Sequence, residues 1–269
     1  MKFHFHAAAA MLAVFLASPA FAQAAALAAP PESSIPAGPK GIAIREGKLL
    51  VSETSQRLPN NVGNGLACTN CHMAGGTSAN ASPWIGIWGV FPEYRARSGK
   101  LISLQERVND CFERSMNGKP LAYTSVEMNS ILAYMQWLSS DVPTGVSVKG
   151  RGFGAIDQKL VPDAGHGKQV YADKCASCHG AEGQGLKNGA AYAFPPLWGK
   201  DSFNDGAGMA RAYTAAAFVK HNMPLGQGGS LSDQDALDVA QYFAHQPRPV
   251  YPGKGKDWPK GDKPKDARL

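Results

Sequence analysis

The stretches Cys68-Thr69-Asn70-Cys71-His72 and Cys175-Ala176-Ser177-Cys178-His179 carry one pattern, in which two cysteines separated by two residues precede a histidine. This pattern is typical of covalent c-type haem attachment, because both thiols can bond the haem vinyl groups while the adjacent imidazole reaches the iron. A cysteine pair alone also suits a zinc half-site or a redox dithiol, but the histidine that follows in both copies fits neither. We therefore expect two covalently bound haem c groups, held by Cys68, Cys71, His72, Cys175, Cys178 and His179.

The first 22 residues have the pattern of a secretory signal peptide. Lys2 precedes an apolar run over residues 7–16, and Ala20-Phe21-Ala22 forms a small-x-small cleavage site. The apolar run is shorter than the roughly 20 residues that a membrane-spanning helix needs, and no later stretch is long and apolar enough. Because c-type haem is attached outside the bacterial cytoplasm, export also suits the two motifs. We expect a soluble periplasmic protein without a membrane span.

The composition and net charge of the chain restrict the possible binding partners only slightly. Removal of the signal peptide leaves 247 residues (269 minus 22), which is enough for two small domains. The formal net charge of +6 falls to +5 once Lys2 is lost, and haem propionates offset part of the remainder. A mild positive charge favours an acidic redox partner or an anionic substrate, and we expect no nucleic-acid partner.

Alignment of the two motifs reveals an internal repeat. In each half, a helix-like segment precedes the first cysteine, over residues 42–55 and 166–174. Each half also ends in a second helix-like segment. Ser125 caps the start of this segment in the first half, and Ser232 caps it in the second half, where Pro247 ends it. The plan resembles the class I cytochrome c fold occurring twice. It predicts an all-α protein with two class I cytochrome c-like domains in tandem, each with one covalent haem c.

A connecting segment separates the two halves. Residues 141–163 contain Pro143 and four glycines without sustained periodicity. We place the boundary near Gly150, which gives a signal peptide over 1–22, an N-terminal domain over 23–150 and a C-terminal domain over 151–269. After Pro247 the chain is rich in proline, glycine and lysine, with Trp258 a large apolar residue among them. We expect a solvated basic tail, the alternatives being packing along the other domain or docking of an acidic partner.

The sixth iron ligand decides whether each haem is a relay or a reaction centre. In class I cytochromes c this ligand comes from the loop before the closing helix, where Met223-Pro224 lies in the second half. Met223 is therefore the expected ligand of haem 2, the alternatives being a core methionine at this position or ligation by the nearby Lys220 or His221. We expect His166 to cap the opening helix, His245 to lie on the surface and Met209 to pack between elements.

The corresponding region of the first half holds the fifth cysteine, Cys111. Four cysteines belong to the haem motifs, so Cys111 has no intramolecular disulfide partner in an oxidising compartment. Three interpretations remain open from spacing alone. Cys111 is a buried inert thiol, Cys111 is an iron ligand of haem 1, or Met116 is that ligand.

The chain resembles the dihaem thiosulfate dehydrogenases, whose first domain is related to the SoxA subunits of sulfur oxidation. The most specific match is residues 107–118, supported by residues 68–75, 94–98 and 222–226. The resemblance implies a catalytic haem 1 with His72 and Cys111 as ligands, and an electron-transfer haem 2 with His179 and Met223. Some relatives carry a lysine directly before that methionine and exchange ligands on reduction, whereas this chain has Asn222 there, which disfavours such an exchange.

The resemblance also implies that Arg97, Arg107 and Ser115 surround the haem 1 cysteine, while Arg95 and Arg114 are structural or face solvent. The implied reaction couples two thiosulfate ions to tetrathionate and releases two electrons to a c-type cytochrome or similar acceptor, or runs in reverse. Planar guanidinium groups suit sulfonate-type oxygens and neutralise the charge of two dianions. The alternatives are a non-catalytic dihaem electron carrier and a SoxA-like subunit of a sulfur-oxidising complex.

Overall fold

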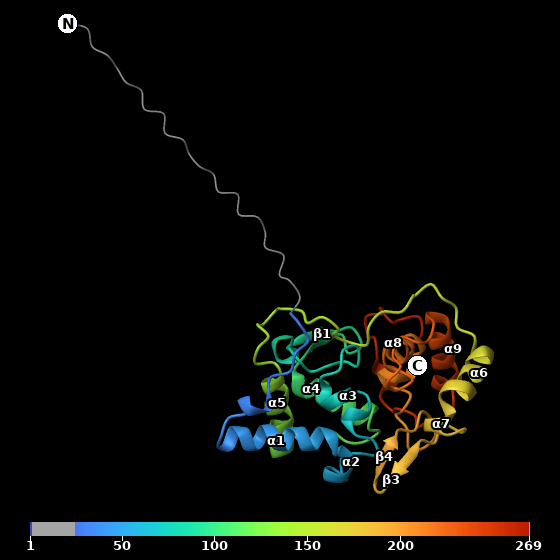
Figure 1. Ribbon diagram of the computed structural model, residues 1–269, viewed down its shortest axis with the longest axis horizontal. Helices are drawn as coiled ribbons and strands as arrows, with labels where there is room; N and C mark the ends of the chain where they lie inside the picture. Colours follow the sequence, from blue (N-terminus) through green and yellow to red (C-terminus); the bar gives the residue numbers. More distant parts are fainter. Residues whose placement is uncertain (2–24, 269) are drawn as a thin grey trace.

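The computed structural model of the protein describes Met1 and residues 25–268. Apart from Met1, the predicted signal peptide lies outside the described residues. Figure 1 shows two helical units side by side, the first coloured blue to green and the second yellow to red. Across the described residues, no helix has the length and apolar character that crossing a membrane would require.

The first unit is mainly helical, with one short hairpin. In chain order its elements are η1 (Glu32–Ser34), α1 (Pro39–Ser52), α2 (Thr54–Arg57), η2 (Cys68–Asn70), α3 (Met73–Gly76), η3 (Ile87–Gly89), β1 (Glu93–Arg95), β2 (Lys100–Ile102), α4 (Leu104–Arg114) and α5 (Val126–Leu138). The second unit repeats this plan. Its elements are α6 (Ala164–Lys174), α7 (Ala176–His179), β3 (Leu186–Asn188), β4 (Ala191–Phe194), η4 (Gly208–Ala210), α8 (Ala212–Asn222), α9 (Asp233–Ala244) and η5 (Lys254–Lys256).

The predicted opening and closing helices are confirmed as α1, α5, α6 and α9. Ser125 caps α5 by accepting from the Met128 N–H at 3.1 Å, and Ser232 with Asp235 forms a capping box at α9. The opening helix of the second unit is capped by Asp163, whose carboxylate accepts from the Gly165 and His166 N–H groups. The expectation that His166 caps this helix is therefore wrong.

Each unit contains a close crossing of its opening and closing helices. α1 packs against α5, and α6 packs against α9. A Cβ atom added to Gly47 of α1 would lie 2.0 Å from the Ser130 carbonyl oxygen, and one added to Gly167 of α6 would lie 1.9 Å from that of Asp238. Only glycine allows backbones to approach this closely. Each crossing covers its own hydrophobic core, and the two cores are separate clusters of buried side chains.

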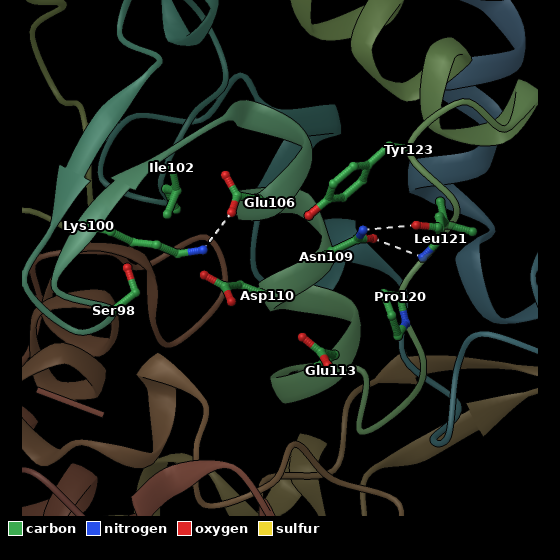
Figure 2. A pocket seen from close by; sticks show the side chains of 10 residues that line it. All are labelled: Ser98, Lys100, Ile102, Glu106, Asn109, Asp110, Glu113, Pro120, Leu121 and Tyr123. Carbon is green, nitrogen blue, oxygen red and sulfur yellow. Dashed lines mark hydrogen bonds and ion pairs between the residues drawn. The ribbon is translucent and has the colours of Figure 1, made fainter. Parts of the chain in front are cut away.

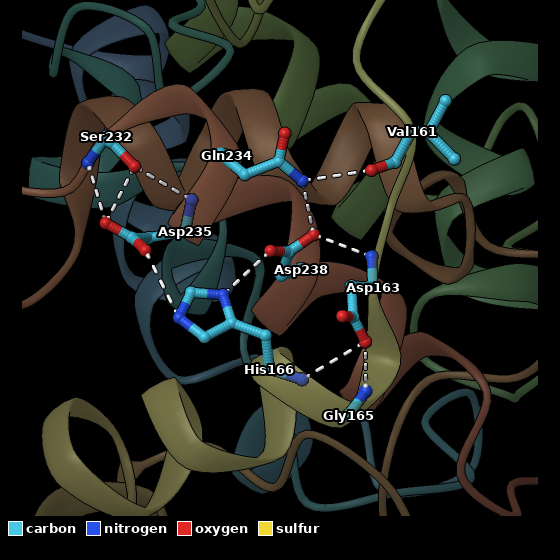
Figure 3. Close-up of polar contacts among 8 residues, drawn as sticks. All are labelled: Val161, Asp163, Gly165, His166, Ser232, Gln234, Asp235 and Asp238. Atoms are coloured by element: carbon cyan, nitrogen blue, oxygen red, sulfur yellow. Dashed lines mark hydrogen bonds and ion pairs between the residues drawn. The ribbon is translucent and has the colours of Figure 1, made fainter.

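A polar network also joins α6 to α9 (Figure 3). His166 Nδ1 lies 2.8 Å from an Asp238 carboxylate oxygen, and the same carboxylate accepts from the Asp163 N–H at 2.7 Å and from Gln234 Nε2 at 2.7 Å. Asp238 is 1% exposed, so these partners satisfy a buried charge. Hydrogen bonding to Asp238 raises the pKa of His166 above its ordinary value.

Two short antiparallel hairpins depart from the all-α prediction. β1 pairs with β2, with Glu93 opposite Ile102, and β3 pairs with β4, with Asn188 opposite Ala191. Their strands are three or four residues long, too short for an alternating pattern to stand out in the sequence. The turn that connects β1 and β2 carries Arg97, one of the predicted site residues.

Backbone and asparagine contacts join the two units. Asn204 of the second unit is 1% exposed, and its Nδ2 donates to the Glu113 carbonyl at 2.8 Å while its N–H donates to that of Arg114 at 3.1 Å. The last carbonyls of α4 have no partner within the helix, so the second unit supplies their donors. The predicted domain boundary near Gly150 stays a prediction. The Gly150 carbonyl accepts a hydrogen bond from the Asn80 N–H.

The tail is not simply solvated, because part of it packs along the other domain, which was the alternative prediction, while residues 259–263 are exposed. Trp258 is 7% exposed, and its N–H donates to the Arg97 carbonyl of the first unit at 2.7 Å. The side chain of Asp257 is 5% exposed and binds Arg114 through two hydrogen bonds of 2.8 Å. The apolar tryptophan and the buried ion pair hold a charged segment on the other unit. We call residues 251–260 the C-terminal strap.

Candidate active site

The first haem motif is fixed by short polar contacts. The Thr54 hydroxyl accepts from the Cys68 N–H at 3.0 Å and donates to its Sγ at 3.4 Å. His72 Nδ1 lies 2.7 Å from the Ser82 carbonyl oxygen, so it carries the ring proton and leaves Nε2 as the free nitrogen. Burial lowers the pKa of His72 to about 4, so the imidazole is neutral at physiological pH.

The second motif repeats this arrangement. His179 of α7 is 9% exposed, its Nδ1 lies 2.8 Å from the Pro195 carbonyl oxygen, and burial lowers its pKa. Tyr134 donates to the Gly75 carbonyl at 2.8 Å in the first unit, and Tyr171 donates to that of Gly180 at 2.7 Å in the second. Each motif thus combines two thiols with a neutral imidazole whose Nε2 is the available donor. This donor set fits covalent haem c in both units.

Three of the four predicted catalytic residues lie on one face of α4 or directly after it. Ser103 and Glu106 form a capping box that fixes the start of the helix. Arg107, Cys111 and Ser115 follow at intervals of four residues and therefore share one face. The Arg107 Nη1 group donates to Cys111 Sγ at 2.9 Å. A negative charge on the Cys111 sulfur raises the pKa of Arg107, although burial opposes this effect.

Cys111 lies beside the first haem motif. Burial raises the pKa values of the Cys68 and Cys71 thiols to about 12, and a charge on Cys111 adds to both shifts. The charge of Arg107 acts on His72, where it adds to the pKa lowering that burial causes. Cys111 is half-buried beside a guanidinium, whereas Met116 is 4% exposed within the first hydrophobic core. These surroundings favour a reactive or ligating sulfur at Cys111 over an inert thiol, and a packing role for Met116.

Arg97 lies in the turn between β1 and β2 and is held from the second unit. Its Nη1 donates to the Gly206 carbonyl at 2.7 Å, its Nε lies 3.5 Å from Asp257 Oδ2, and its guanidinium carbon lies 4.8 Å from the centre of the Trp258 ring. Burial, and after it the charge of Arg114, lowers the pKa of Arg97 to about 10, and Arg107 acts in the same direction. The charges of Arg114, Arg211 and Arg107 therefore all act on Arg97, and we call these four residues the positive cluster.

Arg114 and Arg95 of this region are engaged in ion pairs. Arg114 forms a two-pronged ion pair with Asp257, and its guanidinium carbon lies 4.2 Å from the centre of the Tyr251 ring. Arg95 pairs with Glu93 at 2.8 Å. Ser115 caps the end of α4, and its carbonyl accepts from Asn64 Nδ2 at 3.0 Å.

The haem 2 region keeps Met223 as the candidate sixth ligand. Met223 ends α8 and is partly buried against the second core. Lys220 Nζ donates to the Leu231 carbonyl and pairs with Asp233 at 3.2 Å. His221 Nε2 lies 3.1 Å from the Ala155 carbonyl oxygen. Both alternatives are thus engaged elsewhere, while His245 is exposed at the end of α9, as expected.

A cavity of about 480 Å³ opens on a different face of α4 (Figure 2). Glu106, Asp110 and Glu113 of α4 line it, and the Lys100 ammonium pairs with Glu106 at 2.9 Å. This lining is acidic, so it repels anions. The cavity does not contribute to an anion site at Cys111.

Sequence reasoning missed the contribution of the C-terminal strap to this region. Asp257 and Trp258 contact Arg97 and Arg114, which lie far from them in the sequence. The available signal was Trp258 itself, because a large aromatic residue within a Lys- and Pro-rich segment needs an apolar surface to cover it.

Two family models match the chain in order. One, described as the SoxA/TsdA cytochrome c domain, matches residues 59–144, and the other, described as cytochrome c, matches residues 164–246. The chain is 52% identical over 240 residues to a thiosulfate dehydrogenase of Psychrobacter arcticus, which covers 89% of this chain and 73% of that protein. It is 48% identical to a thiosulfate dehydrogenase of Allochromatium vinosum, over 84% of this chain and 86% of that protein.

A solved structure extends the similarity to the arrangement of both units. The thiosulfate dehydrogenase TsdBA of Marichromatium purpuratum superimposes with a TM-score of 0.80 at 37% identity, over 83% of this chain. The chain spans half the length of that protein. Tandem cytochrome c modules and high identity over most of the length of both curated relatives together show that this chain belongs to the thiosulfate dehydrogenase family.

Proposed function

We propose that the protein couples two thiosulfate ions into tetrathionate and releases two electrons, with Cys111, Arg97, Arg107 and Ser115 forming the reaction site. The observation that carries the proposal is the 2.9 Å contact between Arg107 Nη1 and Cys111 Sγ beside the first haem motif. A guanidinium in this position stabilises a thiolate and also attracts an anionic substrate to the same sulfur. Membership of the thiosulfate dehydrogenase family supports the choice of substrate.

The positive cluster answers the main electrostatic difficulty of the reaction. Two dianions about 5 Å apart repel each other by about 3 kcal/mol even in water, and by more in a partly buried site. Arg97 and Arg107 belong to one cluster of positive charge. Their planar donor groups can hold sulfonate oxygens in fixed orientations, and the Ser115 hydroxyl can add a further hydrogen bond.

The residues that would hold the cofactors are His72 and Cys111 for haem 1, and His179 and Met223 for haem 2. Each haem supplies reversible one-electron chemistry, so two haems match the two electrons released. The protein fixes the protonated Nδ1 of each histidine against a backbone carbonyl, which leaves Nε2 free to bind the iron.

The sulfur of Cys111 would take part directly. The Cys111 thiolate bonds to the outer sulfur of one thiosulfate with loss of two electrons, which gives a Cys–S–S–SO₃⁻ group. A second thiosulfate attacks the sulfur next to the sulfonate, the bond to Cys111 breaks, and tetrathionate leaves with the Cys111 thiolate restored. Arg107 would stabilise the thiolate at the start and end of this cycle.

The cellular setting belongs to the same proposal. A periplasmic location agrees with the signal-like sequence of residues 1–22, and a c-type cytochrome or similar acceptor would remove the electrons. The same site would serve tetrathionate reduction if the potentials of the two haems favoured that direction.

The test is a stoichiometric assay of the purified holoprotein with thiosulfate and an artificial electron acceptor. We expect two thiosulfate ions consumed, one tetrathionate formed and two electrons delivered. An absence of turnover in both directions, with both haems intact, would establish a plain electron carrier instead. Turnover that requires a partner chain and gives no free tetrathionate would establish a SoxA-like subunit.

A further inference from the structure

The C-terminal strap brings a buried carboxylate to the arginine cluster of the first unit. The side chain of Asp257 is 5% exposed and lies between two guanidinium groups. It binds Arg114 through two hydrogen bonds of 2.8 Å, and its Oδ2 lies 3.5 Å from Arg97 Nε. The two short hydrogen bonds pair the Asp257 carboxylate mainly with Arg114. The longer contact neutralises Arg97 less, so Arg97 remains available to bind an anion.

Further contacts of the strap fix the position of Arg97. The Trp258 N–H donates to the Arg97 carbonyl at 2.7 Å, and the Trp258 ring lies under the guanidinium at 4.8 Å. The Gly206 carbonyl accepts from both Arg97 Nη1, at 2.7 Å, and Arg114 Nη1, at 3.2 Å. The Trp258 ring, the Asp257 carboxylate and the Gly206 carbonyl therefore all contact the Arg97 side chain.

The backbone of the strap is in an unfavourable conformation at one residue. Trp258 has a φ of +54°, a left-handed conformation that a bulky residue rarely adopts. Gly99, in the same turn as Arg97, has a φ of +67°, and a Cβ there would lie 2.7 Å from Pro259 Cγ. Such strain persists only where surrounding contacts enforce it, and it occurs preferentially at functional sites.

Electrostatics give the carboxylate a specific role. Arg97 and Arg114 repel each other, and burial followed by the charge of Arg114 lowers the pKa of Arg97, whereas Asp257 raises it. Without this carboxylate, two neighbouring guanidinium groups would face each other in a partly buried place. Loss of the carboxylate would therefore favour separation of the Arg97 and Arg114 guanidinium groups.

We propose that Asp257 and Trp258 of the C-terminal strap are positioning residues that hold the Arg97 guanidinium ready to bind a thiosulfate sulfonate. The second unit would thereby complete the reaction site of the first. This inference rests on the proposed function, because it assigns Arg97 to the substrate.

The experiment compares thiosulfate kinetics of the wild-type holoprotein with those of Asp257→Asn, Arg97→Ala and the double variant. Asparagine keeps the size of the side chain but removes its charge. We expect Asp257→Asn to raise the KM for thiosulfate about tenfold with a smaller change in kcat, because Arg97 loses a charged partner. In the Arg97→Ala background, the same substitution should change kcat/KM less than about twofold, because Asp257 acts through Arg97.

Asp262→Asn serves as the matched control, since Asp262 is exposed beyond the strap. Its kinetics should equal those of the wild type. Thermal midpoints and haem spectra of every variant establish that the fold is intact, and Trp258→Phe, which retains an apolar ring, should keep more activity than Trp258→Ala.

The outcomes separate the two proposals. No turnover by the wild-type holoprotein would overturn the proposed function. Wild-type turnover with an unchanged KM in Asp257→Asn would overturn only the positioning role. An equal loss from Asp257→Asn in the wild-type and Arg97→Ala backgrounds would mean that Asp257 merely stabilises the fold.

Discussion

The Arg107 guanidinium and the Cys111 sulfur lie one helical turn apart, with 2.9 Å between Nη1 and Sγ. Under the proposed function, this pair would distinguish the first unit from a simple electron-carrier module, because it combines a nucleophilic atom with a cation that attracts anions. At the residue scale, the two haem motifs were predictable, since covalent and coordinating chemistry restricts residue types at short spacing, whereas spacing alone left three interpretations of Cys111 open and its role stays a prediction. Asp257 was not predictable, because its partners Arg97 and Arg114 come from another unit.

Replacement of Arg107 should separate chemistry from electron exchange. Arg107→Ala is expected to lower kcat/KM for thiosulfate about 100-fold, because it removes a charged donor from the site. Electron exchange with an artificial donor should stay near the wild-type rate, which stopped-flow absorbance of the haems measures. The control is Arg45→Ala, an exposed arginine of α1. Equal losses in both assays would indicate misfolding and contradict a specific role.

Met223 should set the potential of haem 2. Met223→His is expected to lower the midpoint potential of one haem, because a nitrogen ligand stabilises the oxidised iron more than a thioether does. Lys220→Ala should leave both potentials unchanged, since Lys220 is paired with Asp233. Spectroelectrochemical titration measures both values. A shift caused by Lys220→Ala but not by Met223→His would assign the ligand to Lys220.

At the scale of elements, the starts of the closing helices α5 and α9 followed from caps and periodicity, whereas the contacts between helices did not. Ser125 and Ser232 act locally and were predicted as caps, whereas α6 is capped by Asp163 and not by the predicted His166. The hairpins β1–β2 and β3–β4 are short, and their strands lack an alternating signal. The crossing glycines had no evident role in sequence, because their partners are backbone atoms of the closing helices.

Gly167 tests the crossing of α6 and α9. A Cβ at this position would lie 1.9 Å from the Asp238 carbonyl oxygen, so Gly167→Ala must separate the helices. We expect a loss of about 3 kcal/mol in the free energy of unfolding, measured by denaturant titration of the holoprotein. In Gly165→Ala, the new methyl group would meet only the Asp163 side chain, at 3.1 Å. This control should be neutral or slightly stabilising, and similar losses in both variants would contradict the role of the crossing.

His166 should make stability depend on pH. Its pKa is raised by the hydrogen bond to Asp238, so the folded state binds this proton more strongly than the unfolded state. The resulting stabilisation is complete below the ordinary histidine pKa of about 6.5 and is lost as pH rises through the raised value. The difference in thermal midpoint between wild type and His166→Gln should therefore shrink with increasing pH. A difference that stays constant from about pH 5 to 9 would contradict the assignment.

At the scale of the whole molecule, the two units are joined by specific contacts and not only by the connecting segment. Asn204 of the second unit supplies donors to the last carbonyls of α4, the helix that carries Arg107 and Cys111. The C-terminal strap, which also belongs to the second unit, contacts Arg97 of the first unit. The tandem order of the units follows from the repeated motifs. Their mutual contacts could not be predicted, because buried asparagine and carboxylate partners across an interface leave no periodic pattern.

The most direct test of the account compares tetrathionate formation by wild-type and Cys111→Ala holoproteins, both with a verified content of two haems. Thiosulfate and an artificial acceptor are supplied, and tetrathionate is quantified against time. We predict rapid formation by the wild type and a loss of at least about 100-fold in Cys111→Ala, together with an altered haem 1 spectrum. Full turnover by Cys111→Ala with unchanged haem 1 spectra would contradict the central claim that Cys111 is both ligand and reacting sulfur.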